Sequence, residues 1–171
     1  TSNICTSQVL LAVMASMYGV FHGPDGLKKI AQRIHELAVL LEDSLNKIGL
    51  KQLNENYFDT LLLEGPSEKI RLIAEKNKIN FNYISDNLFS ISLNETTSIN
   101  DVQLIINLIS KATNKETFIT DFSTDSTRIS TSFLRESSFL QTNIFNIHHS
   151  ETSIMRYIKN LERKDLSLTH S

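Results

Sequence analysis

The chain has 171 residues, of which 40% are hydrophobic and 21% charged, and its 17 basic and 19 acidic side chains give a net charge of −2. This balance argues against nucleic acid and membrane surfaces as partners, because both are bound through a broad cationic face. Cys5 is the only cysteine, which excludes an internal disulfide and a multi-cysteine zinc site. The chain opens on Thr1 rather than Met and leads straight into an apolar stretch, so we expect it to be a piece of a longer protein.

The first fifty residues predict two helical segments. Residues from Val9 to Phe21 are apolar on nearly all sides, so a helix there is expected to be buried and to need more protein around it than this end of the chain supplies. A turn is expected at Gly23–Gly26. From Leu27 to Ile48 apolar residues recur at steps of three and four, which predicts a long amphipathic helix with a left-handed cap at Gly49.

Beyond Gly49 the pattern indicates a strand, a helix, two hairpin strands and a helix, in that order. The predicted strands are Tyr57–Glu64, Ile79–Ser85 and Leu88–Leu93, and the predicted helices are Ser67–Lys78, capped by Ser67, and a segment after Ser98, which forms a capping-box pattern with Asp101. The fold class is therefore α+β, a small and mainly antiparallel sheet covered by helices on one face. A Ser/Thr-rich surface connector over 120–132 and a last helix over 152–163 follow.

A cluster of polar residues before the last helix is the first candidate for chemistry. His148, His149 and Glu151 could ligate a metal, but neighbouring residues point in different directions and lack one-turn spacing, so polar structural contacts are favoured. A triad of Ser150, His148 and Asp59 is weaker still, because no G-x-S-x-G motif surrounds the serine.

The start of the chain holds two further candidates. Cys5 lies near a helix start, where a thiolate is favoured, although packing is the more common role of a cysteine among apolar neighbours. The hydroxyls and amides of 1–3 open the same helix and could bind an anion, but plain N-capping is the favoured interpretation on the sequence alone. The residues alone therefore provide no constellation sufficient for catalysis.

Two longer stretches resemble glycine dehydrogenase (decarboxylating), the pyridoxal-phosphate P-protein family of the glycine cleavage system. The first is T-S-N-I-C-T-S-Q at 1–8, continued by His22-Gly23-Pro24. The second begins with Phe145-Asn146, passes through H-S-E-T at 149–152 and ends with the L-E-x-K-D-L pattern at 161–166. Both stretches occur in the family's order, so the resemblance extends from one end of the chain to the other.

The resemblance implies a fragment from the end of the first of two tandem halves, each with the fold of type I pyridoxal-phosphate enzymes. Residues 1–49 would be a large-domain helix and the long connecting helix, 50–119 the small C-terminal α+β domain, and 120–171 the connector and a lead-in helix to the second half. The Schiff-base lysine would belong to that second half. The fragment is therefore expected to be inactive alone and to serve as scaffold and as a wall of the site.

The same resemblance implies site residues and partners. Thr1, Ser2 and Asn3 resemble an element that contacts the phosphate of the cofactor, pyridoxal phosphate, and His148 and His149 would support the second-half site or its substrate channel. The parent enzyme would decarboxylate glycine and pass the aminomethyl group to the lipoyl arm of the H-protein. Its other expected partner is the second half of the same protein or a homologous subunit.

The compartment and two alternatives remain open on the sequence. The residue usage favours a bacterial cytoplasmic protein, whereas a eukaryotic one would lie in the mitochondrial matrix. The alternatives are a standalone α+β binding or interaction module, and a thiol enzyme built on Cys5.

Overall fold

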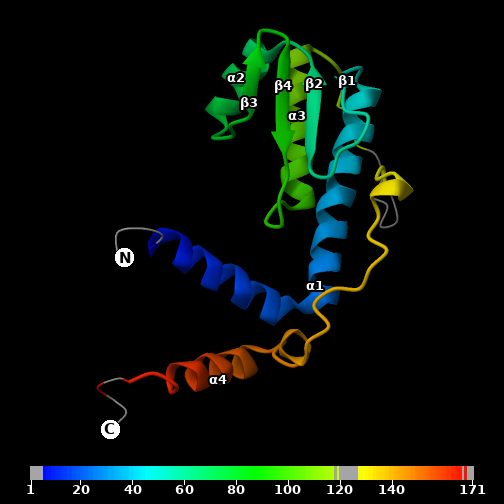
Figure 1. The fold of residues 1–171 in the computed structure, drawn as a ribbon. Coiled ribbons are helices and arrows are strands. Elements are labelled where there is room, and N and C mark those ends of the chain that lie inside the picture. The colour runs from blue at the N-terminus through cyan, green and yellow to red at the C-terminus, as the bar shows by residue number, and fades with distance from the viewer. Residues whose placement is uncertain (1–5, 118, 120–126, 167, 169–171) are drawn as a thin grey trace. The chain divides into compact units, whose positions relative to one another are not determined.

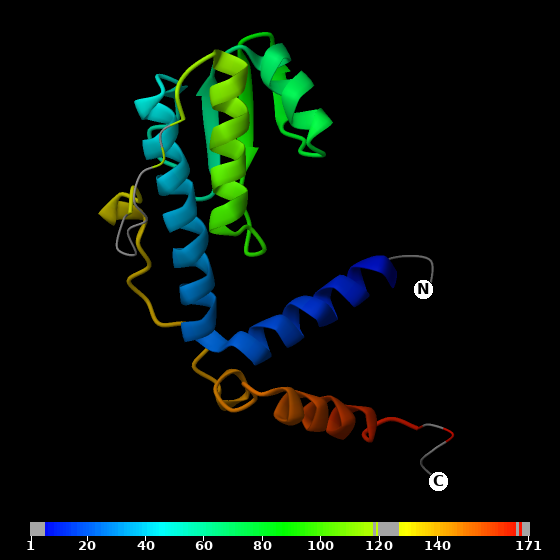
Figure 2. The same cartoon turned by 180° about the vertical axis from the view of Figure 1, so that it is seen from behind.

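The computed structural model describes residues 6–117, 119, 127–166 and 168. The chain forms two compact units, one made of Thr1–Lys29 with Arg135–Ser171 and the other of Ile30–Leu134. Figures 1 and 2 show their elements from opposite sides. Thr1, Ser2, Asn3 and Cys5 lie outside the described residues. Within the described part of the chain, no helix has the length and apolar character that a membrane span requires.

Helix α1, Thr6–Lys47, is interrupted at Gly23, whose φ of 63° and ψ of −177° are not helical. The prediction of a four-residue turn here is therefore wrong, because only one residue leaves the helical conformation. Pro24 follows at once, and a proline fits the first position of a new helical segment because its missing N–H has no intrahelical partner there.

The first segment of α1 is helical as expected but is not buried in this chain. Val9, Leu10, Leu11, Val13 and Met14 are between 51% and 64% exposed. The described part of their own unit therefore does not cover these side chains, which agrees with the expectation that burying this helix requires more protein than this end of the chain supplies. Val20, one turn before the break, is buried at 4% exposure.

The later segment of α1 belongs to the second unit and carries its core, as its apolar stripe predicts. Leu37, Leu41 and Leu45 are fully buried. Gly49 has a φ of 78°, and the Leu50 N–H donates to the Leu45 carbonyl at 3.0 Å. These features confirm the left-handed cap expected at Gly49, where the missing Cβ makes a positive φ inexpensive.

The second unit contains a four-stranded antiparallel sheet in the order β1-β2-β4-β3. Its strands are β1 Lys51–Gln52, β2 Thr60–Glu64, β3 Asn82–Ser85 and β4 Leu88–Ser92, and its helices are α2 Ser67–Lys76 and α3 Ile99–Thr113. In Figure 1 α3 runs behind the sheet, and in Figure 2 it lies in front of it. The expected α+β class and element order are confirmed, whereas the two-residue β1 was missed because it is too short to show alternation.

The N-termini of α2 and α3 are capped in different ways. In α3 the Ser98 side chain accepts from the Asp101 N–H while the Asp101 carboxylate accepts from the Ser98 N–H, which confirms the capping box. In α2 the capping position belongs to Pro66, which makes no side-chain cap. The prediction that Ser67 is the cap is wrong, because Ser67 is buried at 2% exposure and its N–H donates to the Asp86 carbonyl.

The rest of the first unit includes a short 3-10 turn, Asn143–Phe145, and helix α4, Glu151–Glu162. The Ser150 hydroxyl caps α4 by accepting from the Ser153 N–H. Another 3-10 turn, Thr131–Phe133, lies in the second unit. The expected connector falls partly outside the described residues, and its described part, 127–132, is exposed or half-buried.

Candidate functional site at the break in α1

The break at Gly23 is where two distant parts of the first unit meet. A Cβ built on Gly23 would lie 2.5 Å from the Phe145 carbonyl oxygen and 2.7 Å from Cε1 of His149. Both distances are shorter than any real side chain tolerates. A glycine is therefore required here twice, by the positive φ and by the close approach of the segment before α4.

His149 is joined directly to this break. Its Nδ1 lies 2.7 Å from the Phe21 carbonyl oxygen. Because a carbonyl can only accept, Nδ1 must carry the proton and donate, which leaves Nε2 as the acceptor of the neutral ring.

His148, the other histidine predicted as a site residue, makes a separate set of contacts. Its Nδ1 lies 2.9 Å from the Ser153 hydroxyl, and its ring stacks on Tyr157 with centroids 4.6 Å apart. The Ser153 hydroxyl also donates to the Ile147 carbonyl at 3.3 Å, so it accepts from His148 Nδ1. The structure thus holds His148 against α4 and His149 against α1, as expected of adjacent residues.

A cavity of about 360 Å³ opens beside the break. It is lined by Phe21, His22, Gly23, Pro24, Asp25, Gly26, Lys29, Asn146 and His149. The lining includes one cationic side chain, Lys29, one carboxylate, Asp25, and the imidazoles of His22 and His149. The His22 ring is itself positioned between Tyr18 and Phe21, at centroid distances of 4.3 and 5.0 Å.

The arrangement does not form a metal site or a triad. Among the described residues, no group of three His, Cys, Asp or Glu side chains could hold a metal ion. The triad hypothesis also fails locally, because His148 bonds Ser153, whereas the hydroxyl of Ser150 caps α4. What the cavity offers is a polar lining and one imidazole, that of His149, with a fixed tautomer.

A second polar cluster, in the other unit, was missed by sequence reasoning. His35 is 3% exposed, and its Nδ1 lies 2.8 Å from the Phe58 carbonyl oxygen. Its Nε2 accepts from the Arg128 N–H, also at 2.8 Å. With one ring nitrogen donating and the other accepting, both are satisfied only by the neutral ring.

Charges reinforce this second cluster. The Arg128 guanidinium contacts Asp43 at 2.9 Å and Glu42 at 3.4 Å, and the Asp43 hydrogen bond is the largest cause that raises the pKa of Arg128. The Tyr57 hydroxyl donates to Glu42 at 2.6 Å. Burial, followed by that bond, raises the pKa of Tyr57 far above its usual value. The cluster fastens the segment after α3 to α1.

Nothing near His35 in the sequence could have revealed this cluster. Arg128 is 93 residues away, and contacts between residues so far apart produce no periodic pattern in the sequence. A cavity of about 320 Å³ adjoins the ring, with Phe58 and the buried carboxyl residue Glu36 in its lining. Because His35 is fully satisfied by backbone groups, we interpret the cluster as structural.

The chain is similar to members of one family over its whole length. The family model of the glycine cleavage system P-protein matches residues 1–109. A glycine dehydrogenase (decarboxylating) from Flavobacterium johnsoniae is 53% identical over 171 residues, covering 100% of this chain and 18% of that protein. Proteins of the same description from Christiangramia forsetii and a Nostoc species are 49% and 44% identical, each over 100% of this chain and 18% of their own length. The chain therefore spans about a fifth of the relatives that it matches.

Proposed function

Because the chain belongs to the P-protein family of the glycine cleavage system, we propose that the longer polypeptide decarboxylates glycine with pyridoxal phosphate and passes the aminomethyl group to the lipoyl arm of the H-protein. The observation that carries the proposal is the 53% identity over 100% of the chain to a protein described by that activity. The proposal includes the type I fold for each half of the polypeptide, and the cytoplasm of a bacterium as its location. The bacterial origin of the relatives supports this location.

In this proposal the chain is a scaffold and not the catalytic centre. A pyridoxal-phosphate site needs a lysine held in an enclosed pocket and an acid against the ring nitrogen. The described residues do not fit that requirement, because Lys29 and Asp25 at the α1 break are both exposed. The Schiff-base lysine and the acid would therefore belong to residues outside this chain, and His148 and His149 would brace the segment that leads toward them.

The activity is tested on the longer polypeptide. Glycine labelled at its carboxyl carbon should release labelled carbon dioxide when pyridoxal phosphate and lipoylated H-protein are both present. H-protein without the lipoyl group is the matched control and should reduce release to background. Release that does not depend on the lipoyl group, or no release from glycine at all, would contradict the proposal.

Thr1, with Ser2 and Asn3, is proposed to contact the phosphate of the cofactor, as the resemblance of these residues implies. A hydroxyl donates well to a phosphate, so Thr1→Ala in the longer polypeptide should weaken cofactor retention by about tenfold, the loss of one charge-assisted hydrogen bond. Thr1→Ser, which keeps the hydroxyl, should retain the cofactor. Equal retention by the alanine and serine variants, measured by dialysis and cofactor absorbance, would reject this role.

A further inference from the structure

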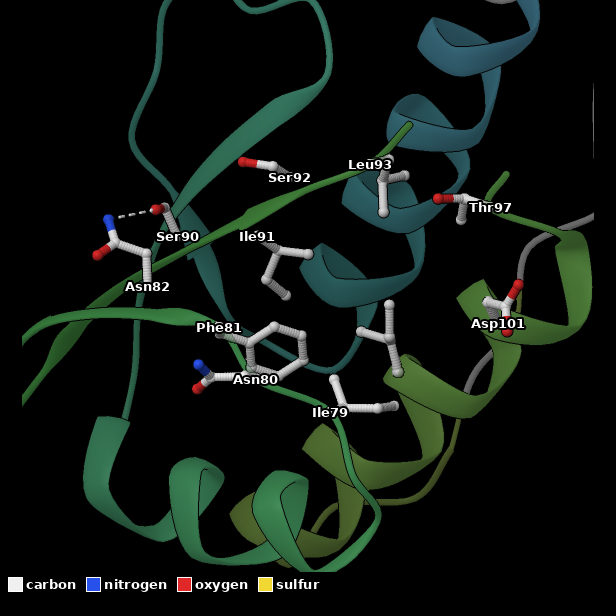
Figure 3. A pocket seen from close by; sticks show the side chains of 11 residues that line it. Ile79, Asn80, Phe81, Asn82, Ser90, Ile91, Ser92, Leu93, Thr97 and Asp101 are labelled. Carbon is white, nitrogen blue, oxygen red and sulfur yellow. Dashed lines mark hydrogen bonds between the residues drawn. The ribbon is translucent and has the colours of Figure 1, made fainter. Parts of the chain in front are cut away.

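Two cavities of the second unit differ in what their linings leave without a partner. In the cavity at the end of β4, shown in Figure 3, the side chains of Phe81 and Ile91 are already buried by this chain. The carboxylate in that lining, Asp101, is exposed and accepts from Ser98 at the start of α3. That cavity therefore gives no reason to expect a ligand. The cavity of about 320 Å³ beside His35 differs, because its lining holds a buried charge.

The carboxylate of Glu36 is this buried charge. Glu36 follows Gln32 by one turn of α1 and is only 6% exposed. Its Oε1 accepts from the Gln32 side-chain amide at 2.8 Å. Among the described residues its other oxygen, Oε2, has no hydrogen-bond or ion-pair partner, and Glu36 is the only charged residue of the eight that line the cavity. The carboxylate thus lines the cavity with one oxygen open.

A carboxylate in this position requires a cation. Moving a charged group out of water is unfavourable unless an opposite charge and further hydrogen bonds replace the water. The neutral amide of Gln32 supplies one hydrogen bond and no charge. The guanidinium of Arg128, whose backbone N–H bonds His35 beside the cavity, is held by two carboxylates further along α1. The ion pairs of the described residues therefore leave Glu36 without a counter-charge.

The rest of the lining defines what kind of cation fits. Phe58 and Leu134 are 41% and 54% exposed, so apolar surface surrounds the carboxylate and is still open to solvent. The Phe58 ring stacks on His35 with the two planes 5° apart. His35 itself contributes no hydrogen bond to a ligand, because backbone groups use both its ring nitrogens. A guanidinium on an aliphatic stem fits this lining best, since it pairs with a carboxylate, stacks on an aromatic ring and is more weakly hydrated than an ammonium.

The length of the relatives indicates where such a guanidinium is available. The chain covers 18% of the relatives that it matches, so about four fifths of each relative lies outside the matched part. A side chain of the same polypeptide reaches the cavity at a high effective concentration, and one ion pair is then enough to hold it.

We propose that an arginine from the remainder of the longer polypeptide enters this cavity, pairs with Glu36 and packs its stem against Phe58 and Leu134. All eight lining residues belong to the second unit, so the site is complete within that unit except for the arginine. The inference needs only the greater length of the polypeptide and does not depend on the activity proposed above.

The first test measures the reactivity of arginines in the longer polypeptide with phenylglyoxal, followed by mass spectrometry of its peptides. Glu36→Gln keeps the size of the side chain but removes its charge. One arginine outside this chain should become about tenfold more reactive in this variant, the effect of losing a charge-assisted hydrogen bond. Glu64→Gln is the matched control, because Glu64 is an exposed carboxyl residue of the same unit, and it should change nothing. Unchanged reactivity in Glu36→Gln, or an increase confined to arginines of this chain, would overturn the proposal.

A second measurement fills the cavity with a free molecule. Replacing the identified arginine by alanine should lower the melting temperature of the longer polypeptide, and propylguanidinium, which reproduces the end of an arginine side chain, should raise it again. Propylurea has the same shape without the charge and is the matched control, so it should restore less. The effect of propylguanidinium should disappear when Glu36→Gln is added. Equal rescue by the two compounds, or rescue that persists with Glu36→Gln, would show that Glu36 does not hold a cation.

Discussion

At the scale of single residues, the contact between α1 and the segment before α4 in the first unit depends on Gly23 having no side chain. Gly23 allows the segment before α4 to reach the backbone of α1, and His149 then bonds the Phe21 carbonyl at 2.7 Å. The same contact fixes the imidazole tautomer. Gly23, which has no side chain, thus determines which nitrogen of the His149 ring carries the proton beside the cavity.

Gly23→Ala is expected to destabilise the folded chain by about 1–3 kcal/mol, because the new methyl group meets Phe145 and His149 and the positive φ becomes strained. Gly19→Ala is the matched control in the same helix. Its Cβ would approach only the Phe145 ring, at an ordinary 3.7 Å, so it should be neutral or stabilising by about 0.5–1 kcal/mol. Urea unfolding of both variants measures the difference, and similar free energies of unfolding would contradict this explanation of the break.

At the scale of secondary-structure elements, the sequence predicts the features that depend on neighbouring residues. It does not predict those that depend on contacts between residues far apart in the chain. The Ser98–Asp101 box and the Gly49 cap are formed by residues within one turn of the helix end, so the sequence displays them directly. The start of α2 was misread because Asp86, from the hairpin turn, accepts the N–H of Ser67. The candidate site follows the same rule. The sequence singles out His148 and His149 as unusual residues, but it cannot reveal that one contacts α4 and the other α1.

The capping box of α3 is expected to make stability depend on pH. Hydrogen bonds from the Ser98 hydroxyl, and then from its backbone N–H, lower the pKa of Asp101 below its usual 3.8. A carboxyl with a lowered pKa stabilises the folded state fully above its unfolded pKa, and this contribution is lost as pH falls below that value. Asp101→Asn should therefore lower stability at pH 6 and have a diminishing effect toward pH 3.

Urea unfolding at several pH values between 3 and 6 measures this effect. Ser98→Ala removes the larger of the two causes but keeps the backbone donor, so its stability should retain part of the pH dependence. A difference between the original chain and Asp101→Asn that stays constant over this range would show that the carboxylate does not act through its charge.

At the scale of the whole molecule, the exposed apolar side chains of the first α1 segment and the length of the relatives support each other. Five large apolar residues there are more than half exposed, and the relatives are more than five times as long as this chain. Burying one leucine contributes about 1.5–3 kcal/mol, so a helix apolar on nearly all sides is stable in water only when other protein covers it. We therefore expect the remainder of the longer polypeptide to cover these residues.

Leu10→Gln tests this expectation, because glutamine and leucine have similar helix propensity and the change alters mainly the hydrophobic contact. In the chain alone Leu10 is 63% exposed, so the substitution should change the free energy of unfolding by no more than about 0.5 kcal/mol. In the longer polypeptide the same substitution should cost about 2 kcal/mol or more, since it removes a buried side chain and places an amide where no partner is prepared. Chemical unfolding of both proteins gives the comparison. Equally small effects in the two would mean that this helix remains exposed in the longer polypeptide, and the position of the chain within a larger folded half would then have to be reconsidered.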